Sequence, residues 1–268
     1  MTTPVLFLHG WAMRGDLFAD VARRLGPDFD CHMPDMPGHG AAADQAGGLD
    51  ACADLAAAWM SRLDRPIVVG WSMGAAIAWR LIERLGTSGM RGLVTLDMSP
   101  RMLPDQGWTQ GLIARDADAI RATAARIVPG WQRMARSIAQ SMFAEGSQPV
   151  PTRTEIADFL CGQDPGNLVS VWADLVEADA RQGIAAIEVP YLVCAGAQSG
   201  LYPRSTAQWL VEAAPDATLA LIEQAGHSPH LEQPEAFCDA ICRFVAAKGL
   251  ASSLTRTQIQ PAQKAPIP

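Results

Sequence analysis

The first hundred residues alternate short apolar runs with longer segments of helical periodicity. The apolar runs are four or five residues long, as is typical of strands, and lie at 5–8, 29–33, 67–71 and 93–97. Helices are predicted between them at 16–25, 48–63 and 73–86. Because the strands are too apolar to have a solvated face, the pattern favours an α/β fold with a parallel sheet covered by helices on both faces.

The strand signal stops between residues 101 and 180, where only helical segments follow. Their expected breaks are Pro129-Gly130, 149–151 and 164–166, which are rich in proline and glycine. Alternation resumes with strands at 191–195 and 218–222 and helices at 205–214 and 233–247. We therefore predict a core formed by residues 1–100 and 185–248 and a helical cap at 101–184. The polar segment 249–268 contains three prolines and is expected to be disordered.

Composition narrows the class of protein. The 268 residues are 49% hydrophobic and can bury the core of one domain, while the net charge of −7 argues against a nucleic-acid partner. No basic region precedes the four-residue apolar run near the N-terminus, so we expect neither a signal peptide nor a membrane span, and a cytoplasmic protein. The six cysteines have no paired CxxC spacing and are expected to be reduced and structural. Cys238 and Cys242, one helical turn apart, lack histidine partners, so we predict no metal.

The segment Gly70-Trp71-Ser72-Met73-Gly74 matches the pattern G-x-S-x-G between a predicted strand and a predicted helix. A serine in such a sharp turn has a strained backbone, and glycines without a Cβ let the turn close while the hydroxyl projects above the sheet. Ser72 is therefore the predicted nucleophile. The N–H groups of Met73 and of Trp11, after the first strand, would form an oxyanion hole worth about 3 kcal/mol per donor.

A serine nucleophile needs a positioned base, and five histidines are candidates: His9, His32, His39, His227 and His230. His227 follows the last predicted strand in a loop that ends at a proline before the next helix, so it can lean over the sheet edge toward Ser72. We predict that His227 is the base. Structural roles are expected for His9, His39 and His230.

Five segments in this order resemble the α/β-hydrolase superfamily over residues 5–247: "LHGW", "PDMPGHG", "GWSMG", "GLVTLDMSP" and "GHSPHLEQPEAF". More narrowly, "LHGWAM", "GLYPR" and "PEAFC" resemble the pimeloyl-(acyl-carrier protein) methyl ester esterases of biotin synthesis. The resemblance implies the α/β-hydrolase fold, with a mostly parallel sheet of about six strands and a cap inserted after the sixth family strand. Since only four residues precede the "HG" strand, the first two family strands are expected to be absent.

The family usually places its catalytic acid in a G-x-x-D-x-x-x-P turn after the next-to-last strand. Gly196 and Pro203 keep this spacing, but Ser199 occupies the position of the acid and cannot supply a carboxylate. The resemblance points to Asp97 instead, because its strand neighbours that of Ser199, about 4.8 Å away, and some haloalkane dehalogenases and lactonases use an acid there. The alternative hypothesis is that Asp97 only caps the turn that follows its strand.

The hypothesis that Asp97 is the catalytic acid predicts the effects of two variants. Asp97→Asn should lower kcat sharply and leave folding intact, whereas Ser199→Ala should have little effect. Asp35, in "PDMPGHG", is a weaker candidate because its strand lies on the far side of the nucleophile strand.

The resemblance implies hydrolysis of a carboxylic ester through an acyl-enzyme, without a cofactor, by Ser72, His227 and Asp97. Arg136 and Arg153 match two of the cap arginines with which the family grips an acidic acyl carrier protein, whereas Gln140 and Ala157 stand where two others would be. Residues 101–153 hold seven arginines and four acids, a local charge of +3, which leaves −10 elsewhere. This asymmetry fits an acidic partner, and it fits solvated helix faces as well.

Three other functions stay open. A general small-ester or lactone hydrolase would use the same residues without a carrier protein, and a carbon–carbon bond hydrolase would use the same scaffold. A catalytically dead binding protein would explain the missing acid at position 199.

Overall fold

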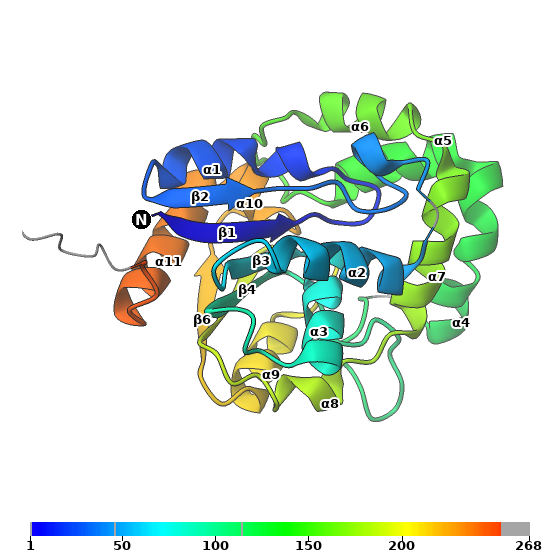
Figure 1. Ribbon diagram of the computed structural model, residues 1–268. Coiled ribbons are helices and arrows are strands. Elements are labelled where there is room, and N and C mark those ends of the chain that lie inside the picture. Colours follow the sequence, from blue (N-terminus) through cyan, green and yellow to red (C-terminus); the bar gives the residue numbers. More distant parts are fainter. Residues whose placement is uncertain (1, 46, 114, 253–268) are drawn as a thin grey trace, which may run out of the picture.

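The computed structural model describes residues 2–45, 47–113 and 115–252 (Figure 1). Within these residues, six strands form one sheet in the order β2-β1-β3-β4-β5-β6, and every neighbouring pair is parallel. The predicted α/β-hydrolase architecture, with its parallel sheet of about six strands, is confirmed. The strands are β1 (Thr3–Leu8), β2 (Phe29–His32), β3 (Ile67–Trp71), β4 (Gly92–Leu96), β5 (Tyr191–Gly196) and β6 (Ala217–Ile222).

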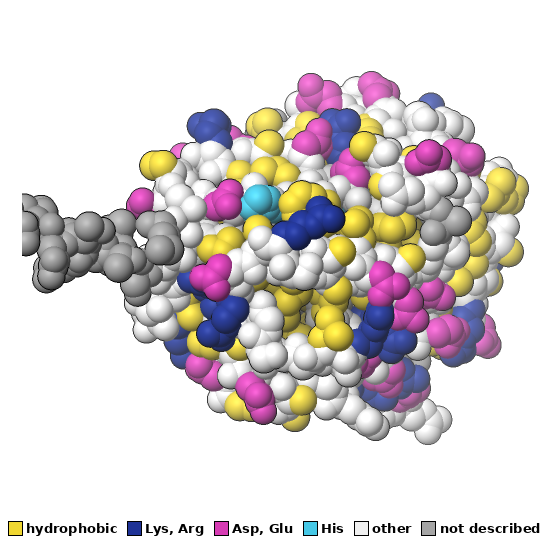
Figure 2. Space-filling model, in the orientation of Figure 1, with side chains coloured by type: hydrophobic (Ala, Val, Ile, Leu, Met, Phe, Trp, Pro, Cys, Tyr) yellow, Lys and Arg dark blue, Asp and Glu magenta, His cyan; other side chains and the backbone are white. Residues whose placement is uncertain are grey.

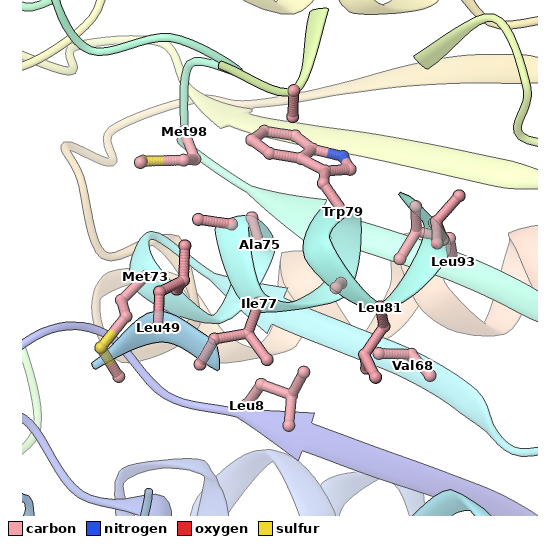
Figure 3. Packing of buried hydrophobic residues seen from close by; sticks show 14 of the residues in the cluster. Leu8, Leu49, Val68, Met73, Ala75, Ile77, Trp79, Leu81, Leu93 and Met98 are labelled. Carbon is pink, nitrogen blue, oxygen red and sulfur yellow. The ribbon is translucent and has the colours of Figure 1, made fainter. Parts of the chain in front are cut away.

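Helices cover both faces of the sheet. One face carries α2 (Leu49–Met60), α3 (Met73–Leu85), α8 (Arg181–Ile184) and α9 (Arg204–Ala213), and the other carries α1 (Ala19–Leu25) and α11 (Pro234–Ala247). Side chains alternate between the faces, so Leu8 of β1 packs under α3 (Figure 3). Shorter helices are η1 (Gly15–Phe18), η2 (Gly40–Ala42), η3 (Pro165–Leu168) and α10 (Pro229–Glu232).

The two edge strands differ from the expectation that no strand has a solvated face. Every residue of β1, β3, β4 and β5 is buried, whereas β2 and β6 are partly exposed, and Leu219 of β6 is 41% exposed. Each edge strand has a neighbour on one side only, so its other side meets solvent. The apolar pattern identified the strands but not their places in the sheet.

Four of the helices between β4 and β5 lie beyond the carboxyl ends of the strands, coloured green at the right of Figure 1. They are α4 (Ala117–Arg121), α5 (Ala124–Ser141), α6 (Arg153–Cys161) and α7 (Val169–Glu177). The expected break at 149–151 is a loop, and the one at 164–166 falls between α6 and α7, where η3 begins at Pro165. The division into core and cap stays a prediction.

The expected break at Pro129-Gly130 is wrong, because α5 continues through Pro129. Its buried side chains recur every four residues at Ile127, Trp131, Ala135 and Ala139, and this apolar stripe keeps the helix continuous. Pro129 lies on the exposed face, where water can satisfy the carbonyl left without its helical donor.

The ordered chain extends further than predicted. Leu250 is buried, Ser252 N–H donates to Thr3 Oγ1 at 2.9 Å, and Arg91 donates to the Leu250 carbonyl at 3.2 Å. Residues 249–252 therefore pack on the core, contrary to the expectation of disorder, and the rest of the predicted tail, 253–268, lies outside the described residues. Within the described ranges, no helix is both long enough and apolar enough to cross a bilayer.

Candidate active site

Ser72 lies in a sharp turn between β3 and α3. Its backbone has φ 53° and ψ −114°, a strained conformation for a residue with a side chain, and its N–H donates to the Leu96 carbonyl at 3.0 Å. A Cβ at Gly74 would clash with the Leu8 carbonyl, and one at Gly70 would clash with the backbone of Gly74. The tight turn that the glycine spacing predicts is therefore present, and it places Ser72 at the carboxyl end of the sheet.

Ser72 opens onto a cavity of about 220 Å³ between the sheet and the helical segment. His227, Gly10 and Trp11 line the same cavity from the strand ends. The remaining wall is mainly apolar and contains two tryptophans and several methionines, among them Met13, Met98, Met102, Met134 and Met142. Such a lining suits an acyl chain, since methionine side chains adapt to flexible apolar ligands.

His227 is held on three sides. Its Nδ1 lies 2.7 Å from Asp97 Oδ2, its N–H donates to the Met142 carbonyl at 2.9 Å, and its carbonyl accepts from Trp71 Nε1 at 2.8 Å. Both His227 and Asp97 are buried. With Nδ1 engaged by the carboxylate, Nε2 is the ring nitrogen left to receive a proton from Ser72.

Asp97 is the residue directly after β4. Its φ is 44°, and its N–H donates to the Cys194 carbonyl at 2.9 Å. Within the described residues, no backbone N–H donates to the carboxylate, so the cap of a turn is not its role in this structure. Its hydrogen-bond partners are His227 and, unexpectedly, Ser199, whose Oγ lies 2.6 Å from Oδ2. The structure thus brings Asp97 and His227 together, and catalysis by them stays a prediction.

The predicted oxyanion donors flank Ser72. Met73 is the first residue of α3, and Trp11 lies in the loop after β1. In the described part of the chain, neither backbone N–H has a hydrogen-bond acceptor. The Trp11 indole donates to the Leu168 carbonyl at 3.0 Å and packs on Trp172, which ties the loop to the helical segment. His9 braces the loop from behind, because its Nε2 accepts from the Met36 N–H at 2.9 Å. Burial lowers the pKa of His9 to about 3, so this ring is neutral.

The other histidines do not line the cavity. His39 is buried with Nδ1 2.9 Å from the Pro37 carbonyl, and burial lowers its pKa. His32 is partly exposed beside Asp30, 3.1 Å away. His230 is buried and stacks on Phe18 with ring centroids 4.6 Å apart, and burial lowers its pKa to about 3.

Two carboxylates shape loops near the site. Glu232, which sequence reasoning missed, is buried and accepts from three backbone N–H groups: Ala144 at 2.6 Å, Gly226 at 2.8 Å and Ser228 at 3.3 Å. The sequence marks it only as an acid five residues after His227, in the segment that forms α10. Asp35, the weaker candidate acid, accepts from the N–H groups of Gly15 and Ala41, both at 2.7 Å.

The two arginines proposed for carrier binding have different surroundings. Arg136 is exposed on α5 and donates to the Gln132 carbonyl of the same helix at 3.2 Å. Arg153 is half-buried; it donates to the carbonyls of Ser147 at 2.8 Å and Ala144 at 2.6 Å and lies over the Phe143 ring. Neither lines the cavity.

No group of three or more His, Cys, Asp or Glu side chains in the described ranges is placed to hold a metal ion. Cys238 and Cys242 are free thiols. The chemistry available at this site is that of the serine, the imidazole and the carboxylate.

Comparison with known proteins agrees with this geometry. Residues 5–240 match the model of the alpha/beta hydrolase family. The pimeloyl-(acyl-carrier protein) methyl ester esterase of Chromobacterium violaceum is 33% identical over 243 residues, which cover 90% of this chain and 93% of the relative. The esterase of the same name from Vibrio cholerae is 28% identical over 245 residues, covering 90% and 93%.

Solved structures show the same fold. An esterase from Exiguobacterium antarcticum has a TM-score of 0.81 at 22% identity, covering 91% of this chain and 92% of that one. A thermophilic esterase from Thermogutta terrifontis has a TM-score of 0.80 at 21% identity, covering 94% and 92%. The fold, the serine turn and the match over residues 5–240 lead to one conclusion: this chain belongs to the alpha/beta hydrolase family.

Proposed function

We propose that the protein is a serine carboxylic-ester hydrolase that acts through an acyl-enzyme. The observation that carries this proposal is the 2.7 Å contact between His227 Nδ1 and Asp97 Oδ2 beside the strained Ser72 turn, with Ser72 and His227 on one cavity. Ser72 Oγ attacks the ester carbonyl while His227 Nε2 accepts its proton and passes it to the leaving alcohol. Asp97 stabilises the imidazolium, and the N–H groups of Trp11 and Met73 stabilise the oxyanion.

The second half of the reaction uses the same groups. His227 removes a proton from water, the hydroxide attacks the acyl carbonyl, and the bond to Ser72 Oγ breaks as the proton returns to that oxygen. The reaction therefore needs no further group for its proton transfers.

We propose a carrier-bound acyl methyl ester as the substrate, because the relatives are named as esterases of pimeloyl-(acyl-carrier protein) methyl ester. The apolar cavity suits the acyl chain. If the protein serves biotin synthesis in this way, it would act in the cytoplasm, beside the carrier.

The positive charge on the surface of α5 supports the proposal of an acidic partner. Arg126, Arg133 and Arg136 are exposed on this helix, and no carboxylate of the described residues lies within 4.0 Å of them. By contrast, basic and acidic side chains lie side by side at the lower right of Figure 2. Elsewhere on the described surface, Arg80 of α3 pairs with Asp50 of α2, and Arg121 of α4 pairs with Glu177 of α7. Arginines without internal partners are available to the carboxylates of a carrier protein.

A hydrolysis assay tests the activity. The wild-type protein should hydrolyse pimeloyl-carrier methyl ester and short p-nitrophenyl esters, Ser72→Ala should be inactive, and the surface variant Ser205→Ala should keep full activity. A fluorophosphonate should label wild-type Ser72. A wild-type protein that neither turns over esters nor reacts with the fluorophosphonate would be a binding protein instead.

The carrier is tested separately. Arg136→Ala should raise KM for the carrier-bound ester several-fold without changing kcat/KM for p-nitrophenyl esters, because only the carrier meets α5. The matched control is Arg243→Ala, an exposed arginine of α11, which lies at the opposite end of the sheet from α5 (Figure 1). An unchanged KM would favour a general ester or lactone hydrolase.

A further inference from the structure

Ser199 makes an unexpected contact with the candidate acid. Its Oγ lies 2.6 Å from Asp97 Oδ2, the same oxygen that lies 2.7 Å from His227 Nδ1. The Leu201 N–H donates to Ser199 Oγ at 3.3 Å. Since that oxygen already accepts a hydrogen bond from the backbone, its own proton is directed to the carboxylate.

We propose that Ser199 is a positioning residue that holds the Asp97 carboxylate toward His227, an inference that rests on the proposed function. Asp97 stands directly beyond β4, in a left-handed conformation, and its carboxylate receives no backbone N–H among the described residues. The Ser199 hydroxyl therefore supplies the second hydrogen bond of this side chain. A hydrogen bond to an ionised group is short and strong, and it fixes the direction of the acceptor.

The identity of residue 199 agrees with this role. An ionised carboxylate at position 199 would stand against Asp97, and two carboxylates at this distance cannot both stay charged. A hydroxyl at the same place donates a proton to the carboxylate instead of repelling it. Because Asp97 supplies the acid from the end of β4, the residue after β5 should be a hydrogen-bond donor to that carboxylate and not a second acid.

The sequence alone predicted that Ser199→Ala has little effect. Because Ser199 donates to Asp97, we now expect this variant to be slower. Removing the hydroxyl leaves Asp97 with one hydrogen bond and freedom to rotate, so acylation and deacylation of Ser72, which both use His227, slow together. We expect a decrease in kcat of about tenfold with KM within a factor of two, because Ser199 does not line the substrate cavity. The melting temperature should change little.

A double-mutant cycle tests the proposal with p-nitrophenyl acetate as the probe. Ser199→Ala should lower kcat about tenfold in the wild-type background and less than twofold in the Asp97→Asn background, because a residue that acts through Asp97 loses its effect once the carboxylate is gone. Ser199→Thr, which keeps the hydroxyl, should recover most of the rate, and Ser205→Ala, in the nearby helix α9, should be unaffected.

The outcomes separate this proposal from the proposed function. A wild-type protein that hydrolyses the probe and an Ser199→Ala variant with unchanged kcat would overturn the positioning role alone. Equal losses from Ser199→Ala in both backgrounds, or a slow Ser199→Thr, would also overturn it. A wild-type protein inert to both the ester and a fluorophosphonate would overturn the proposed function and this proposal with it.

Discussion

Glu232 illustrates how a single buried carboxylate orders the loop that carries His227. Its two oxygens accept from the N–H groups of Ala144, Gly226 and Ser228. Glu232→Gln would direct an NH2 group at one of these donors and leave buried N–H groups without an acceptor. We expect the free energy of unfolding to fall by about 2–4 kcal/mol, with a lower kcat, in urea titrations and ester assays.

Glu235→Gln is the matched control, because the Glu235 side chain is 84% exposed. Its unfolding free energy should stay within about 0.5 kcal/mol of the wild type. If the two variants had the same stability, Glu232 would not hold the loop.

His230 makes the stability of the protein depend on pH. Burial lowers its pKa to about 3 from an ordinary value of 6.5, and neither ring nitrogen has a hydrogen-bond partner in the described residues. Between these two values the unfolded chain binds a proton that the folded ring does not, so the free energy of unfolding falls as the pH falls. We expect His230→Phe to reduce that fall by about 1.4 kcal/mol per pH unit between pH 6 and pH 4.

Urea unfolding of both proteins at several pH values measures this difference. Phenylalanine can keep the stacking on Phe18 and the tilted contact with Trp71 without a titrating group. Parallel pH dependences for the wild type and His230→Phe would show that His230 is protonated in the folded protein.

Among the elements, α5 shows where packing overrides local preference. Pro129 removes a helical hydrogen bond, yet the apolar stripe of α5 keeps the helix intact. Pro129→Ala should therefore raise the free energy of unfolding by about 1–3 kcal/mol and leave ester hydrolysis unchanged. The neighbouring Val128→Ala, at a side chain that is 55% exposed, should change it by less than about 0.5 kcal/mol. A destabilised Pro129→Ala would mean that proline is preferred there.

The same contrast explains which elements could be predicted from the sequence. The strands and the Ser72 turn depend on local patterns, namely apolar runs and glycines where no Cβ fits. Whether α5 continues through Pro129 depends on whether this residue faces the core or the solvent. The contact of Ser199 with Asp97 depends on the distance between two strand ends. Neither is encoded in residues adjacent along the chain.

At the scale of the whole molecule, the family fold places residues from distant parts of the sequence at one edge of the sheet. Ser72, Asp97 and His227 follow β3, β4 and β6, and the helical segment closes the cavity above them. The structure confirms that β4 and β5 are neighbours, the arrangement for which the resemblance pointed to Asp97 as the replacement acid. The catalytic role of Asp97 stays a prediction. The basic surface of α5, on a chain with a net charge of −7, is where we propose that an acidic partner binds.

The central claim is that Asp97 supplies the carboxylate for His227 when Ser72 is acylated. The rate of Ser72 acylation in Asp97→Asn, followed as the burst of p-nitrophenol from p-nitrophenyl acetate, tests it most directly, with Asp216→Asn at the opposite ends of the strands as the control. We predict a decrease of about a thousandfold or more with an unchanged melting temperature. A burst rate within twofold of the wild type in a folded Asp97→Asn protein would contradict the claim.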